Sequence, residues 1–210
     1  MAFSDYESLA QVQQEYQIKY QEENFISEIY IDIPAIFISE LDFNLSSMDA
    51  FSSEAARCEL LIFPVLREIY KNYHQKTALW VQKTFGFDAK LNGTPDYMLS
   101  QKSELGKTIL GLPLLMLVEA KRNDFEQGWG QCLAELVAAD HLNHHKRPVY
   151  GIVTDGNLWQ FGRLQNNVFT KNIASYTITK LAELFCAVNY LFDLATHDLA
   201  ASPTDESQSQ

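Results

Sequence analysis

The chain has 210 residues and a formal net charge of −11, and 47% of its residues are hydrophobic. This length and composition predict a globular protein with one main domain, and they exclude a membrane-spanning protein because no apolar run is long enough to cross a bilayer. The start of the chain lacks a basic segment followed by an apolar stretch, so we expect a cytoplasmic location.

The negative charge is concentrated at the two ends of the chain. Residues 1–54 hold 11 acids and one base, which is a net charge of −10. Residues 191–210 hold four acids and no base, whereas residues 55–190 hold 12 acids and 15 bases, a net charge of +3. An acidic protein repels phosphates, but this central segment is mildly basic and remains compatible with a nucleic-acid partner.

The first third of the chain shows two kinds of apolar periodicity. Apolar residues at helical spacing predict an amphipathic helix within residues 5–24. Alternating isoleucines predict a short strand over residues 29–33, which Pro34 ends. An apolar stripe predicts a helix from residue 52 to residue 73, and Pro64 should kink or interrupt it.

Strands and one long helix are predicted in the centre of the chain. The segments 79–81 and 114–118 read as strands, and the second is an unbroken apolar run typical of a strand buried on both faces. Asp124, with Gln127 three residues later, has the form of a capping box. We expect a helix from there to about residue 144.

The remaining elements alternate between strands and turns before a last helix. Residues 150–154 and 158–161 flank a glycine-containing turn and predict a hairpin. A second turn leads into a strand at 168–170, and residues 181–194 predict a final amphipathic helix.

Two carboxylates and one lysine stand beside the central strands. Glu119 and Lys121 follow the apolar run and, at positions i and i+2 of a strand, project from the same face. Burying these charges is unfavourable unless they are paired or bound to a ligand. Asp96, from a neighbouring strand, adds a second carboxylate. Such a set can hold Mg²⁺ and direct a water molecule at a phosphate.

These residues resemble the motif of the PD-(D/E)XK nuclease superfamily. Pro95 and Asp96 match its PD element, residues 119–121 match its acid-x-Lys element, and the likeness covers roughly residues 50 to 170. Within the superfamily the chain is similar to a group of cyanobacterial proteins, and the segments that carry this likeness are 53–59, 118–121, 130–135 and 150–154. The resemblance implies a restriction-endonuclease-like α/β fold (α+β), with a central mixed β-sheet flanked by helices.

The resemblance also implies roles for the acidic and basic residues. Asp96 and Glu119 would bind Mg²⁺ or Mn²⁺, and Lys121 would orient the attacking water and offset charge in the transition state. Relatives of this fold often supply a further metal-binding carboxylate from the first helix. Glu54 is the candidate for that carboxylate, and Glu59 is the reserve candidate.

Gln131 completes the candidate catalytic set, because many relatives carry a glutamine on the helix after the acid-x-Lys strand. Each candidate also has a structural interpretation. Asp96 suits a turn, Glu119 and Lys121 could form a buried ion pair, Glu54 suits the first turn of a helix, and Gln131 could face solvent.

The sequence therefore predicts three regions and one preferred function. Residues 1–50 would form an acidic N-terminal extension packed on or near the core, residues 51–197 the nuclease-like domain, and residues 198–210 a disordered tail. We expect a Mg²⁺ (or Mn²⁺)-dependent nuclease that hydrolyses DNA and forms a homo-oligomer, because cutting both strands needs two sites. The alternative is a non-catalytic interaction module that keeps the nuclease-like fold.

Overall fold

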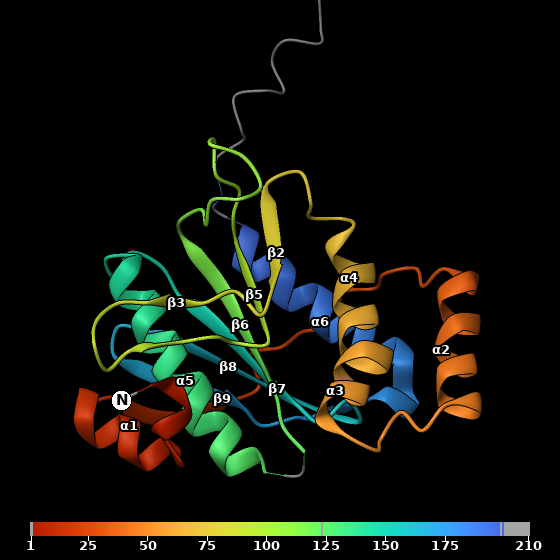
Figure 1. The fold of residues 1–210 in the computed structure, drawn as a ribbon, viewed down its shortest axis with the longest axis horizontal. Coiled ribbons are helices and arrows are strands. Elements are labelled where there is room, and N and C mark those ends of the chain that lie inside the picture. Colours follow the sequence, from red (N-terminus) through yellow and green to blue (C-terminus); the bar gives the residue numbers. More distant parts are fainter. Residues whose placement is uncertain (1, 123, 198, 200–210) are drawn as a thin grey trace, which may run out of the picture.

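The computed structural model of the protein describes residues 2–122, 124–197 and 199. Within them, an eight-stranded mixed sheet forms the centre of the molecule (Figure 1). Its strands are β1 (Lys19–Glu23), β2 (Thr77–Val81), β5 (Tyr97–Gln101), β6 (Leu114–Ala120), β7 (Val149–Thr154), β8 (Leu158–Gln165), β9 (Val168–Asn172) and β10 (Tyr176–Thr177).

The strand order of the sheet is β1-β9-β8-β7-β6-β5-β2, with β10 paired to β8. Two neighbouring pairs are parallel, β6 with β7 and β1 with β9. The other pairs are antiparallel. A separate short hairpin pairs β3 (Phe85–Gly86) with β4 (Asn92–Gly93). The predicted mixed α/β class, with helices around a central mixed sheet, is confirmed.

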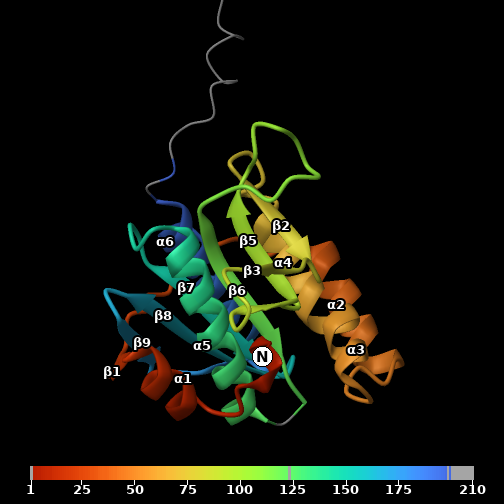
Figure 2. The same ribbon diagram turned by 60° about the vertical axis from the view of Figure 1, so that its left-hand side comes forward.

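Helices cover both faces of the sheet. They are α1 (Leu9–Tyr16), α2 (Ala35–Ser47), α3 (Glu54–Arg57), α4 (Phe63–Tyr70), α5 (Phe125–Leu142) and α6 (Leu181–Thr196), with the short turns η1 (Phe3–Asp5), η2 (Cys58–Ile62) and η3 (Ile178–Lys180). Figure 2 shows α1 and α5 on one face of the sheet and α4 and α2 on the other. One apolar core lies between the sheet and α5, and the second lies between the sheet, α4 and α6.

The apolar run of β6 is buried along its whole length, as the sequence predicts. Helix α5 connects β6 to the parallel strand β7, as a parallel strand pair requires a crossover. The helix begins after Asp124, whose side chain accepts a hydrogen bond from the backbone N–H of Gln127. This capping bond satisfies one of the free N–H groups of the first turn and fixes where the helix starts beside the end of β6.

The predicted helix over residues 52–73 is present, but its central part is π-helical. The segment runs through α3, η2 and α4 from Glu54 to Tyr70. Pro64 has no N–H, so it cannot bond the carbonyl of Leu60 four residues earlier. The side chain of Asn44 in α2 donates to that carbonyl at 2.9 Å instead. The proline is therefore accommodated by a wider turn and a partner from a neighbouring helix.

Of two predictions for the N-terminal region, one is confirmed only in part and the other is wrong. The predicted helix over residues 5–24 ends at Tyr16, and residues 19–23 form the edge strand β1. The predicted strand over residues 29–33 is absent from the described structure, and helix α2 begins two residues after its end. The side chains of β1 are all exposed, so their sequence carries no apolar alternation, and the strand exists because it pairs with β9.

The later predicted elements are confirmed by β7, β8, β9 and α6. Asn166 and Asn167 form the tight turn between β8 and β9, with φ angles of 52° and 57°. This left-handed conformation is one that asparagine adopts readily. The predicted disordered tail, residues 198–210, lies outside the described residues except for Leu199. No helix of the described residues is long and apolar enough to cross a membrane.

Candidate active site

Asp96, Glu119 and Lys121 meet at one end of two neighbouring strands. Asp96 directly precedes β5, and Lys121 directly follows β6. The antiparallel register pairs Tyr97 with Val118, so the residue before Tyr97 lies opposite Glu119. The backbone N–H of Ala120 donates to Oδ2 of Asp96 at 2.8 Å. This bond fixes one carboxylate oxygen of Asp96 against the end of β6.

The alternation of β6 directs Glu119 and Lys121 toward α5. Leu117 belongs to the apolar core beneath α5, whereas Met116 and Val118 belong to the core on the opposite face. Residues 119 and 121 therefore share the α5 face. The Nζ atom of Lys121 lies 3.7 Å from Oε2 of Glu119, and the Glu119 residue is only 1% exposed. The ion pair predicted as the structural alternative is thus present.

Helix α5 adds a buried glutamate to this group, and the sequence reasoning missed it. Glu135 is completely buried, and Oε1 accepts a hydrogen bond from Nε2 of Gln131 at 3.5 Å. The carboxyl groups of Glu135 and Glu119 are within hydrogen-bonding reach of each other. The sequence contained a usable signal, because Glu135 lies between Cys132 and Leu136 of the buried stripe, where an acid needs a partner.

Gln131 is buried rather than facing solvent, so the solvent-facing interpretation of this residue is wrong. It lies one helical turn before Glu135, and its amide joins the group around Glu119 through Glu135. The structure therefore brings together four of the five candidate residues, namely Asp96, Glu119, Lys121 and Gln131, on the side of the sheet that α5 covers.

Glu54 lies on the other side of this group. It is exposed, and it begins α3, where Ser53 provides the N-cap by accepting from the N–H of Ala56 at 3.0 Å. Its charge is close enough to raise the pKa of Asp96. The first-turn interpretation of Glu54 thus agrees with the structure, and its role as a metal ligand stays a prediction. Glu59, the reserve candidate, is also exposed.

The electrostatics of the group are set by burial. Burial raises the pKa of the Asp96 carboxyl, and the N–H of Ala120 and the charge of Lys121 oppose this change. Burial also raises the pKa of Glu119 and, more strongly, that of Glu135, where the neighbouring charge of Glu119 adds to the effect. Asp96 and Glu119 thus interact with Lys121, and the buried Glu135 interacts with both of these acids. This combination favours either bound protons or a bound cation.

The donor set fits Mg²⁺ or Mn²⁺. Oε1 of Glu119 and Oε2 of Glu135 are buried oxygens without a hydrogen-bond partner in the described residues. Within the same residues, no group of three or more His, Cys, Asp or Glu side chains is arranged to hold a metal ion by itself. Mg²⁺ commonly takes only one or two carboxylates and completes its shell with water and substrate phosphate. Asp96 and Glu119 are the two carboxylates available for that arrangement.

Comparison with known proteins gives a likeness to solved structures but no match by sequence. No protein-family model and no curated protein matches the sequence. Among solved structures, the chain is similar to the type IIG restriction endonuclease BpuSI, with a TM-score of 0.47 and 14% sequence identity. The likeness covers 73% of this chain but only 18% of that enzyme. Membership of the PD-(D/E)XK superfamily and the narrower likeness to the cyanobacterial group therefore stay predictions that rest on the motif.

Proposed function

We propose that the protein is a Mg²⁺-dependent nuclease that hydrolyses phosphodiester bonds in DNA. The observation that carries this proposal is the meeting of Asp96, Glu119 and Lys121 at the end of β5 and β6. Two carboxylates beside a lysine provide both the ligands for a divalent cation and a positive charge next to it. A purely structural ion pair would not need the second carboxylate of Asp96.

Asp96 and Glu119 would hold the metal ion, which supplies Lewis-acid activation of the scissile phosphate and of a water molecule. The hydrogen bond from Ala120 holds Asp96 in place for this task. Lys121 would position the water and stabilise negative charge on the phosphate in the transition state. Gln131 would orient groups around Glu119 through Glu135, and Glu54 would approach from the exposed side.

Substitution of Asp96 by alanine tests the metal site directly. We expect Asp96→Ala to weaken Mn²⁺ binding by about 100-fold, because it removes one of two carboxylate ligands. Isothermal titration calorimetry with MnCl₂, in the absence of nucleic acid, measures the change. Glu126→Gln is the matched control, since Glu126 is an exposed acid on α5 and its loss should leave the affinity within about twofold. Equal affinity of Asp96→Ala and wild type would contradict the proposal.

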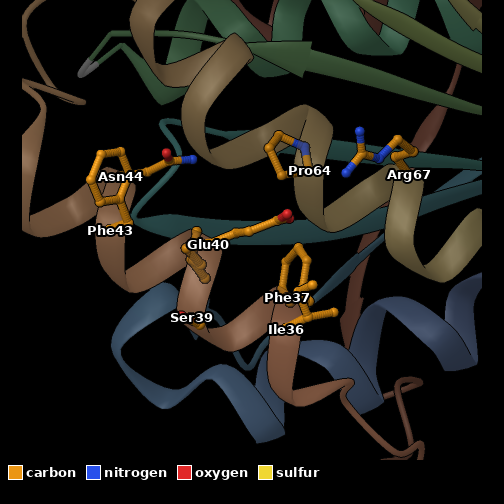
Figure 3. A pocket seen from close by; sticks show the side chains of 9 residues that line it. Ile36, Phe37, Ser39, Glu40, Phe43, Asn44, Pro64 and Arg67 are labelled. Carbon is orange, nitrogen blue, oxygen red and sulfur yellow. The ribbon is translucent and has the colours of Figure 1, made fainter.

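The non-catalytic alternative is favoured by a specific feature, the exposed apolar surface of α2 and the segment before it. Tyr30, Ile36 and Phe43 are 82%, 71% and 61% exposed. A groove of about 500 Å³ separates α2 from α4, and Figure 3 shows Phe37, Glu40 and Arg67 around it. Residues 28–54 contain six acids and no lysine, arginine or histidine. This combination fits a cationic amphipathic helix of another protein.

A synthetic helical peptide of leucine and lysine tests this alternative. We expect the wild type to bind it, and we expect the double substitution Ile36→Ser, Phe43→Ser to reduce the affinity by about 10-fold or more, because both exposed contacts are lost. Fluorescence anisotropy of the labelled peptide measures the binding. Val81→Ser is the control, since Val81 is 51% exposed but lies on β2. Equal binding by all three proteins would remove the support for this alternative.

A further inference from the structure

The carboxylate of Glu135 belongs to the candidate site, and the function proposed above uses it only as the link between Gln131 and Glu119. Helix α5 is buried on nearly all sides from Gly128 to Asp140, and Glu135 lies within that stretch with no exposed surface. An acid in such a position needs a partner. Among the described residues, the hydrogen bond from Gln131 satisfies Oε1, whereas Oε2 has no partner.

The unpartnered oxygens of the site belong to two carboxyls that interact with each other. Oε1 of Glu119 lacks a partner in the described structure as well, and its carboxyl is within hydrogen-bonding reach of that of Glu135. The Nζ atom of Lys121 lies 3.7 Å from Oε2 of Glu119 and forms an ion pair with it. With Asp96 included, the group holds three carboxyls and one lysine, so a divalent cation would balance their charge.

The topology distinguishes Glu135 from Glu54 as the helix-borne acid of this site. Glu119 faces α5, and Glu135 approaches it from that same side within the buried core. Glu54 begins α3, on the opposite side of the sheet, and is exposed to solvent. Once ionised, a buried carboxylate interacts with a nearby cation in a lower dielectric than an exposed one, so its attraction for the cation is larger.

We infer that Glu135 is a positioning residue of the cation site. Its carboxylate would hold Glu119 and a water molecule bound to the metal ion, while Gln131 holds the carboxylate of Glu135 in place. This inference rests on the proposed function and names a further residue of the same site. Mg²⁺ retains several waters when it binds proteins, and carboxylates behind the direct ligands orient those ligands and waters. Such an outer position agrees with the lack of a three-acid metal cluster in the described residues.

Mn²⁺ affinity, measured without nucleic acid, tests the inference. We expect Glu135→Gln to weaken Mn²⁺ binding by about 10-fold, because the charge is lost while an acceptor oxygen remains. We expect Glu135→Leu to weaken it by about 100-fold, because both are lost. Glu126→Gln removes an exposed negative charge from the same helix and should change the affinity by no more than about twofold. Calorimetric titration and the Mn²⁺ electron paramagnetic resonance signal provide independent readouts.

Thermal unfolding of the metal-free proteins separates this role from a merely structural one. Glu135→Leu should raise the melting temperature by about 2–4 °C, because it replaces a buried acid that lacks a full set of partners. A structural glutamate would give the opposite result, with a lower melting temperature and unchanged Mn²⁺ affinity. Wild type without Mn²⁺ binding would overturn the proposed function itself. If the wild type binds Mn²⁺ and the Glu135 variants bind it with an affinity within twofold of the wild type, only the inference is overturned.

Discussion

Lys121→Ala should abolish most DNA cleavage while leaving the metal site intact. The ammonium group of Lys121 is not a metal ligand, and its Nζ atom lies 3.7 Å from Oε2 of Glu119. Loss of a positive charge that stabilises the transition state lowers the rate by about 10²–10³-fold. Removal of a neighbouring cation should maintain or strengthen Mn²⁺ binding, since it removes repulsion between two positive charges. Supercoiled-plasmid cleavage and Mn²⁺ calorimetry measure the two effects separately.

Lys83→Ala is the matched control for this prediction. Lys83 packs over the ring of Trp80, 5.4 Å from its centroid, and lies outside the group formed by Asp96 and Glu119. Its removal should change the cleavage rate by less than about threefold, because only the general attraction for DNA is reduced. Lys121→Ala protein that cuts as fast as wild type would show that the lysine serves only as the ion-pair partner of Glu119.

Gly130→Val should destabilise the protein by detaching the N-terminal segment from α5. A Cβ atom at residue 130 would lie 2.6 Å from the backbone N of Ser8 and 2.8 Å from the carbonyl O of Tyr6. Backbone atoms cannot move aside as a flexible side chain does, so we expect a loss of about 3 kcal/mol in the free energy of unfolding. Urea denaturation followed by circular dichroism measures this loss.

Glycine normally destabilises a helix, so the direction of the stability change on substitution of Gly130 is informative. Substitution of a helical glycine by alanine normally stabilises a protein by about 1 kcal/mol. Gly130→Ala should instead destabilise this one, and cleavage by trypsin at Lys19 should become faster as α1 separates from α5. Glu126→Ala, an exposed position on the same helix, should leave stability within about 0.5 kcal/mol. A stabilised Gly130→Ala protein would contradict the observed close packing.

The sequence predicts elements well where burial is dictated by local pattern. The apolar run of β6 and the capping residue Asp124 correctly indicate a strand followed by a helix, and this pair of elements positions Glu119 and Lys121. The acid-x-Lys spacing then correctly places both side chains on one face. Gly130 also explains how the backbone of Tyr6 and Ser8 approaches α5 closely, although no local pattern in residues 6–8 indicates this contact.

Elements determined by distant contacts are predicted poorly. Strand β1 is exposed throughout and is stabilised by parallel pairing with β9, nearly 150 residues further along the chain, which no local periodicity reveals. Helix α2 carries apolar residues on several sides, with Phe37 buried and Phe43 exposed, so it lacks a clear stripe. The alternating isoleucines before it favour a strand that forms no pairing in the described structure.

The residues of the candidate site also divide into those that a local pattern predicts and one that depends on distant contacts. Asp96, Glu119 and Lys121 are recognisable from a short motif beside apolar strands, and the structure places them together. Glu135 does not belong to that motif, and its proximity to Glu119 depends on how α5 crosses the sheet. The sequence gives its position on a helix, but the crossing angle and depth of that helix are set by tertiary packing.

Cleavage of supercoiled plasmid and single-stranded DNA over a range of Mn²⁺ and Mg²⁺ concentrations tests the central claim most directly. Wild-type protein should nick or cut DNA only with added metal, and Asp96→Asn should reduce the rate by about 100-fold or more because it removes a ligand charge without changing side-chain size. Intact DNA at every metal concentration, or equal rates for wild type and Asp96→Asn, would contradict a nuclease centre at the end of β5 and β6.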